Sequence, residues 1–338
     1  MTRRSTGRAL AALACAATLT VTAACGDSGA QPADAAGATT VRLGFSAWPG
    51  WFPWQVAQEK GLFAENGVEV ELKYFDSYTD SLNALGTGNL DANSQTLNDT
   101  LSTVSSGAKQ TVVLVNDNST GNDQIIAREG ISSVADLRGK KVAAEQGTVD
   151  HYLLLLALRE AGLTEKDVRF TPLLTDAAAA AFVAGQVDAV GVFAPFTTTA
   201  LERPGSKAIA TSADFPGAIP DHLVFDSEFV AENQKAVQAV VQTWFDTVAW
   251  IKANPAEAVG IMAKRGGVSA AEYKEYDAGT TIFTREQNLA AFAEGDTPAN
   301  LDHQARLIAE FLVSTGLVDE KPELAGLLEP KFVQAVKG

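Results

Sequence analysis

The sequence of 338 residues has few side chains that bind metals or form disulfides: two cysteines and three histidines. Both cysteines, Cys15 and Cys25, lie near the N-terminus, so the rest of the chain can form no internal disulfide. The histidines, His151, His222 and His303, have no cysteine near them and no close metal-ligand spacing. A P-loop and a G-x-S-x-G nucleophile motif are also missing. We therefore expect no metal, no cofactor and no catalytic residue.

Basic residues are scarce as well. There are 26 lysines and arginines against 41 aspartates and glutamates, which gives a formal net charge of −15. Three of the arginines lie in the first 24 residues, where there is no acid, so a chain starting at residue 25 has a charge of −18. Such a surface disfavours nucleic acids and anionic lipid head groups. We expect no nucleic-acid partner.

The longest apolar run, Ala9 to Ala24, is too short for a membrane-spanning helix, which needs roughly 20 residues. Arg3, Arg4 and Arg8 precede it, and small residues end it. This pattern predicts a signal peptide over residues 1–24 that is removed from the mature protein.

The sequence around the expected cleavage point, Val21-Thr22-Ala23-Ala24-Cys25-Gly26, resembles a bacterial lipobox, in which the cysteine becomes the lipid-modified first residue. The alternative is ordinary secretory cleavage beside an unrelated cysteine. A lipid on Cys25 would hold the protein at the outer face of the cell membrane. Residues 25–40 contain no large apolar side chain, and we expect them to form a flexible tether.

From Val41 onward the pattern alternates strands and helices, which predicts an α/β fold with mainly parallel sheets. The expected strands of the first half are Val41–Phe45, Val68–Phe75, Leu90–Ser94 and Thr111–Val115. Polar, turn-prone residues from Asn116 to Asp123 suggest a crossing into a second lobe. We therefore expect lobe one over 41–118 and 223–338 and lobe two over 119–222. A stripe of apolar residues at helical spacing, Val237 to Ile251, is expected to pack in the core.

Several short segments, in this order, resemble nitrate/taurine/sulfonate-type (SsuA/THI5-like) ABC transporter substrate-binding proteins. They are Ser46-Ala47-Trp48-Pro49-Gly50-Trp51, Ala57 to Phe63, Gly67 to Val70, Gly88 to Ala92, Val134 to Val142 and Gly185 to Ala189. The likeness covers about residues 41–255. The Trp-Pro-Gly-Trp opening and Gly121-Asn122-Asp123 also resemble variants associated with urea- or guanidine-degrading enzymes.

The resemblance implies a two-lobed periplasmic-binding-protein-like fold of type II, with a solute held in the cleft between the lobes. It implies a protein that delivers a small polar solute to an ABC permease and its ATPase and that is not an enzyme. The signal peptide and lipobox predict an extracytoplasmic location, and a monomer is the simplest expectation. Two other classes stay open: a pyrimidine-precursor synthase-like enzyme on the same fold, and a sensory binding module.

Ligands of such sheets bind beyond the carboxyl ends of the strands, so the loops after the strands are the candidate site. These loops contain no lysine or arginine but several carboxylates and aromatic rings, a combination that suits a cation such as guanidinium. A sulfonate or nitrate held by helix N-termini is the alternative. The predicted ligand-binding residues are Ser46, Trp48, Trp51, Gln95, Thr96, Asp99, Asn118, Glu145, Thr148, Asp150, Phe193 and Asp221.

Overall fold

The computed structural model of the protein describes residues 39–337. The predicted signal peptide, the lipidation at Cys25 and nearly all of the tether lie outside these residues. None of the helices between residues 39 and 337 is long and apolar enough to cross a membrane.

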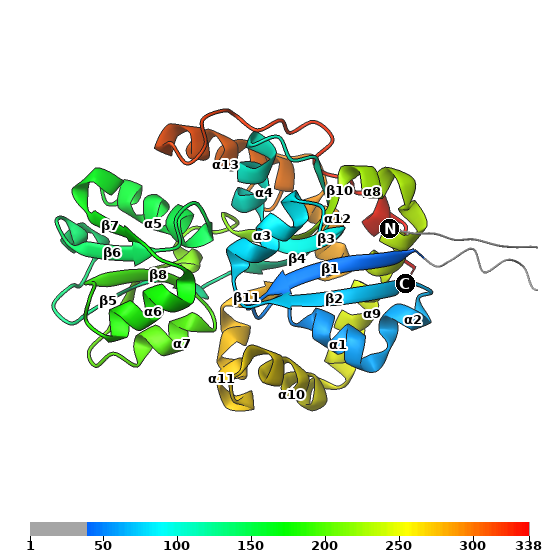
Figure 1. Ribbon diagram of the computed structural model, residues 1–338, viewed down its shortest axis with the longest axis horizontal. Helices are drawn as coiled ribbons and strands as arrows, with labels where there is room; N and C mark the ends of the chain where they lie inside the picture. Colours follow the sequence, from blue (N-terminus) through cyan, green and yellow to red (C-terminus); the bar gives the residue numbers. More distant parts are fainter. Residues whose placement is uncertain (1–38, 338) are drawn as a thin grey trace, which may run out of the picture. The chain divides into compact units, whose positions relative to one another are not determined.

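The strands form two sheets (Figure 1). The larger sheet, in spatial order, consists of β11 (Thr280–Ile282), β4 (Gln110–Ser119), β10 (Pro220–Asp226), β3 (Ala92–Thr96), β1 (Thr40–Ser46) and β2 (Glu69–Phe75). The smaller sheet consists of β7 (Arg169–Pro172), β6 (Lys141–Ala144), β8 (Ala189–Phe193), β5 (Asp123–Ala127) and β9 (Lys207–Thr211). This α/β architecture confirms the predicted fold class.

Each sheet is mixed. The strands β1, β2 and β3 run parallel, as do β6, β7 and β8, whereas β4, β10 and β11 in one sheet and β5 and β9 in the other add antiparallel pairs. The antiparallel strands β4, β5 and β10 are those that lead from one sheet into the other and back.

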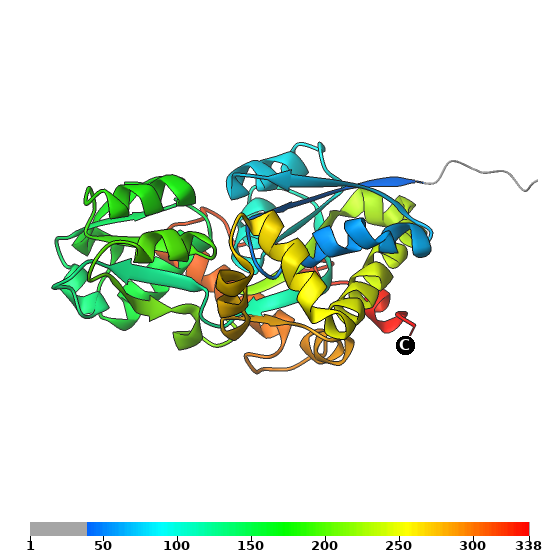
Figure 2. The same ribbon diagram turned by 90° about the horizontal axis from the view of Figure 1, so that it is seen from below.

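Helices cover both sheets. Those of the smaller sheet are α5 (Val149–Glu160), α6 (Thr175–Val183) and α7 (Phe196–Leu201). Those of the rest of the chain are α1 (Pro53–Lys60), α2 (Leu62–Glu65), α3 (Tyr78–Gly86), α4 (Leu97–Ser105), α8 (Ser227–Glu232), α9 (Gln234–Ala253), α10 (Pro255–Gly266), α11 (Ala270–Glu275), α12 (Arg285–Ala291), α13 (Leu301–Thr315) and α14 (Lys331–Gln334). Figure 2 shows α1, α9 and α10 packed together, in agreement with their contacts.

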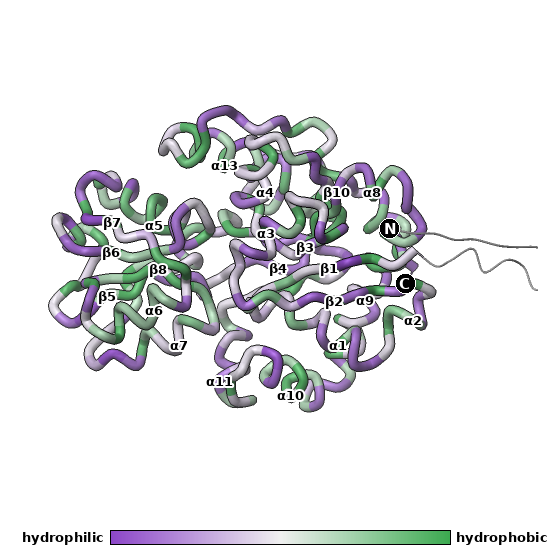
Figure 3. The backbone as a smooth tube through the Cα atoms, viewed as in Figure 1, coloured by the Kyte–Doolittle hydropathy of each residue, from purple (hydrophilic) through white to green (hydrophobic). Residues whose placement is uncertain are grey.

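The core of the larger half contains the apolar face of α9, whose Val237, Val240, Val241 and Trp244 are buried. The Trp244 ring lies 4.6 Å from that of Trp54, so the stripe predicted to pack in the core does so. In the smaller half, hydrophobic residues run along the strands near β5 and β8, and hydrophilic ones gather in the outer loops (Figure 3).

The segment Asn116 to Asp123, predicted as a turn, is mostly strand. β4 continues to Ser119 and β5 begins at Asp123, so only Thr120 to Asn122 connect them. Backbone pairing of β4 with β10 and β11 stabilises the extended conformation, and it outweighs the turn preference of the asparagines and aspartates. The two connections between the sheets touch, because the hydroxyls of Ser119 and Ser212 lie 2.6 Å apart.

Candidate ligand-binding site

Side chains from the larger sheet gather where its strands end. Trp48 and Trp51 lie in the turn after β1, and Thr96 ends β3. In β10, Asp221 stands opposite Thr96 on one side and opposite Asp117 of β4 on the other. The central position of β10 therefore brings polar groups of three neighbouring strands together.

The smaller sheet supplies the facing groups. Asp123 begins β5 and is paired with Phe193 at the end of β8. Glu145 follows β6, and Asp150 lies in the first turn of α5. The hydroxyl of Thr79, in α3, donates a hydrogen bond to Glu145, so the two halves are in contact across the site.

Four aromatic rings enclose the centre of the site. The ring of Trp48 lies 6.4 Å from that of Trp51 and 6.3 Å from that of Phe193, and Tyr78 lies 5.5 Å from Trp51 and 6.2 Å from Phe193. They border a cavity of about 10 Å³, together with Thr96, Asp123, Val149 and Asp221. This volume fits about one water molecule. A larger solute fits only if the side chains around this cavity move apart.

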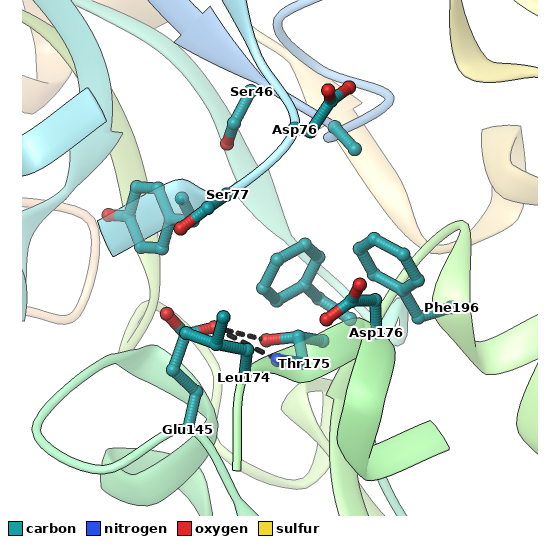
Figure 4. Close-up of a pocket in the computed structure, with 11 residues that line it drawn as sticks. Ser46, Asp76, Ser77, Glu145, Leu174, Thr175, Asp176 and Phe196 are labelled. Atoms are coloured by element: carbon teal, nitrogen blue, oxygen red, sulfur yellow. Dashed lines mark hydrogen bonds between the residues drawn. The ribbon is translucent and has the colours of Figure 1, made fainter. Parts of the chain in front are cut away.

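A second cavity of about 90 Å³ lies beside the first, and Tyr78 and Phe193 border both. Figure 4 shows Ser46 and Ser77 on one side of it and Glu145 with Thr175 on the other. The outer cavity therefore shares two of the four aromatic rings with the inner one.

Five aspartates beside these rings are almost completely buried, each with at most 2% of its surface exposed. They are Asp99, Asp117, Asp123, Asp150 and Asp221. No lysine or arginine borders either cavity, and none of the ion pairs in residues 39–337 involves any of the five. Buried carboxylates in proteins are ordinarily paired with a cation or neutralised by a proton.

Neutral donors satisfy only part of this cluster. Asp117 accepts a 2.8 Å hydrogen bond from Trp48 Nε1, and Asp99 accepts one of 2.7 Å from the hydroxyl of Thr96. Four buried carboxylate oxygens of the cluster have no hydrogen-bond donor among residues 39–337. They are Asp117 Oδ2, Asp123 Oδ2, Asp150 Oδ1 and Asp221 Oδ2. The Nε1 of Trp51 and the hydroxyl of Ser46 are likewise buried without a partner there.

The pKa values reflect this burial. Desolvation raises the pKa of Asp99 and that of Asp123 from 3.8 to about 7. Desolvation also raises the pKa of Asp117, and it raises the pKa values of Asp150 and Asp221 well above the ordinary range, with neighbouring carboxylates adding to the effect for both. The site therefore favours either a bound cation or protons.

The N-terminus of α5 illustrates why an anion is disfavoured. The backbone N–H of Val149, in the first turn of α5, acts to lower the pKa of Asp99, although burial outweighs this effect. A carboxyl group of the protein thus already lies near the N–H groups at this end of the helix.

The structure brings most of the predicted ligand-binding residues together. Ser46, Trp48, Trp51, Thr96, Glu145, Phe193 and Asp221 border one of the two cavities, and Asp99 and Asp150 are buried against them. Thr148 instead borders a polar surface groove with Asp99 and donates a hydrogen bond to the Glu145 carbonyl.

Two more predicted residues lie away from both cavities. Gln95 points into the larger half, where its amide donates a 2.9 Å hydrogen bond to Thr100. Alternation along β3 explains this, because Gln95 and Thr96 face opposite sides of the sheet. Asn118 borders a separate cavity beside Pro216 and Phe283.

Asp117 and Asp123 lie in the segment predicted to be turn-prone and were not among the predicted ligand-binding residues, but both are buried in the site. Gly50 is the sequence feature that is connected with the buried position of Asp117. A β-carbon on Gly50 would lie 2.0 Å from Asp117 Oδ2, so the glycine of the Trp-Pro-Gly-Trp turn makes room for that carboxyl group. Tyr78 and Val149 also border the inner cavity, and neither was among the predicted site residues.

Comparison with known proteins decides the family. The model of the NMT1-like family matches residues 34–265. The chain belongs to the NMT1-like family. A binding protein of Brucella abortus is 30% identical over 80% of this chain and 85% of its own length. The taurine-binding periplasmic protein of Escherichia coli is 27% identical over 79% of this chain and 84% of its own.

Solved structures share the fold. The aliphatic sulphonate binding protein SsuA from Escherichia coli superposes with a TM-score of 0.72, at 24% identity over 86% of this chain and 92% of that one. The nitrate-binding protein NrtA from Synechocystis gives 0.64 at 16% identity over 89% of this chain and 99% of that one. The desulfurization enzyme DszB also shares the fold, with a TM-score of 0.60 at 17% identity, over 87% of this chain and 97% of that one. The NMT1-like family member described here thus shares its fold with binding proteins and with an enzyme.

Proposed function

We propose that this protein captures a small planar nitrogen cation of the guanidinium type and delivers it to an ABC importer. The observation that carries the proposal is the set of five buried aspartates next to the indoles of Trp48 and Trp51, which no basic side chain among residues 39–337 neutralises. A bound cation would supply the missing charge.

A guanidinium ion fits this chemistry in two ways. Its N–H groups form planar edges that pair with carboxylate oxygens, and several such oxygens have no donor in the described part of the chain. Its flat face can lie on an aromatic ring, which contributes roughly 0.5 to 2 kcal/mol. Aspartates come from both halves, Asp221 from one and Asp123 from the other, so the cation would favour their closure.

A urea-like solute is the second candidate, and Trp51 favours it. The buried Nε1–H of Trp51 has no acceptor in residues 39–337, and the carbonyl oxygen of urea would provide one. Urea would leave the charge of the carboxylates uncompensated, so protons would have to remain on them.

A sulfonate, taurine or nitrate, as the names of some relatives suggest, is the alternative that the site supports least. Such an anion would lie among carboxylates with no lysine or arginine on the walls. The identity to the taurine-binding relative is 27%, which leaves room for a different ligand.

The transport role rests on the family and on the two-sheet architecture. We infer that residues 41–118 and 223–338 form lobe one and residues 119–222 lobe two, and that the lobes move about the connections between the sheets. The signal peptide, the lipid on Cys25, the extracytoplasmic location and the monomeric state belong to the same proposal. A sensory role would require a signalling partner, and catalysis would require a reaction; the residues of the site indicate neither.

Calorimetric titration of the purified protein with guanidine, urea, taurine, an alkanesulfonate and nitrate, at one pH and salt concentration, tests the proposal. We expect guanidine to bind with the highest affinity. Binding of taurine or the alkanesulfonate, with no heat from guanidine and urea, would overturn it.

A further inference from the structure

Two pairs of carboxyl groups in the site are placed so that each pair needs a proton. In the first pair, Asp117 and Asp221 stand directly opposite each other in β4 and β10, and both are almost completely buried. The Oδ2 atom of each has no hydrogen-bond donor among residues 39–337. Two neighbouring buried carboxylates repel each other, and a proton on one of them removes this repulsion.

The second pair shares one hydroxyl group. Thr175 Oγ1 lies 2.6 Å from Glu145 Oε2 and 2.7 Å from Asp150 Oδ2. A threonine hydroxyl has one hydrogen to donate. It can donate a full hydrogen bond to only one of the two carboxylates, and a proton held within the pair would supply the second hydrogen bond at Oγ1.

The surrounding elements offer no basic group that would make these protons unnecessary. The titratable groups whose charge acts on Asp117, Asp150 and Asp221 are Asp99 on α4, Asp123 on β5 and Glu145 after β6. Tyr78 on α3 and Tyr273 on α11 also face the cluster. His222 follows Asp221, but its ring contacts Thr100 on the other side of β10.

We propose that shared protons join Asp117 to Asp221 and Glu145 to Asp150 in the protein without solute, and that the solute cation binds in exchange for at least one of them. This inference rests on the proposed function, because it takes the solute to be a cation. Its consequence is that capture depends on pH: a more acidic medium stabilises the protonated site and weakens binding.

Titration calorimetry with guanidinium in two buffers of different ionisation enthalpy counts the protons released. We expect about one proton per cation at pH 7, and an affinity that rises by up to about tenfold per pH unit between pH 5 and 7. Asp117→Asn removes one member of the first pair and should release fewer protons with a shallower pH dependence. Asp80→Asn, at an exposed position of α3, removes the same charge outside the site and should behave like the unmodified protein.

Unfolding free energy measured against pH, without solute, tests the protons independently. Buried carboxyl groups hold protons in the folded state that the unfolded state has already released, so the stability should fall as the pH rises from about 4 to about 7. Asp117→Asn should reduce this fall.

The two measurements separate the failures. Tight guanidinium binding without proton release would overturn the exchange and leave the proposed function intact. Absence of guanidinium binding would overturn the proposed function. In that case, the unfolding free energy still tests the shared proton. The same pH dependence in Asp117→Asn as in the unmodified protein would overturn it, and a shallower pH dependence in Asp117→Asn would support it.

Discussion

Replacement of Asp221 by asparagine should weaken solute binding and strengthen the fold at the same time. Asp221 is 1% exposed, its Oδ2 has no donor in the described chain, and Asp117, Asp123 and Asp99 all repel its charge. In the bound state this carboxylate would face the cation. Loss of one partner from a desolvated charged contact costs about 2 to 5 kcal/mol, which corresponds to a loss of affinity of at least about thirtyfold.

The stability change has the opposite sign. An asparagine keeps the shape of the side chain, and its amide can donate to Asp117, so it relieves a buried group that lacks a partner, an effect of about 1 to 3 kcal/mol. Titration calorimetry with guanidinium and urea denaturation of Asp221→Asn, beside Asp80→Asn as control, would measure both changes. Unchanged affinity for guanidinium, together with reduced stability, would show that Asp221 serves the fold and not the solute.

Three further substitutions probe individual contacts. Gly50→Ala should displace the Asp117 carboxyl group, because its β-carbon would lie 2.0 Å from Oδ2, and calorimetry should record at least about tenfold weaker binding. Trp48→Phe keeps an aromatic face but removes the 2.8 Å hydrogen bond to Asp117. We expect it to lose less affinity for guanidinium than Trp48→Ala, and equal losses would contradict a role for the ring. Trp54→Ala removes a core side chain packed on Trp244 and should lower the unfolding free energy by about 3 to 5 kcal/mol. The fraction that still folds should bind guanidinium with unchanged affinity, and a loss of binding there would place Trp54 in the site.

The sequence predicted the architecture well because its signals are local. Alternating strands and helices, and the glycines that end them, define the α/β class and the strands β1 to β3. Gly61, for example, ends α1 in the left-handed conformation with φ of 72°. The extension of β4 through Asn116 to Ser119 was missed, because its pairing partners, β10 and β11, lie about 100 residues or more away in the sequence.

The site was predictable in chemistry but not in detail. Loops rich in acids and aromatic rings, without lysine or arginine, indicated a cationic solute. The sequence could not show that Asp117 and Asp123 are buried, since a polar residue near a strand end reads equally well as a turn. Nor could it show which of Gln95 and Thr96 faces the site, because that depends on the pairing of β3 with the distant strand β10.

A crystal structure of the protein grown with guanidinium would show whether the solute is a cation held by the buried aspartates. We expect a planar cation against the indoles of Trp48 and Trp51, with its N–H groups donating to aspartates of both sheets, Asp221 and Asp123 among them. A cation absent from this position, or a sulfonate bound in it from a parallel soak, would overturn the proposed cation site.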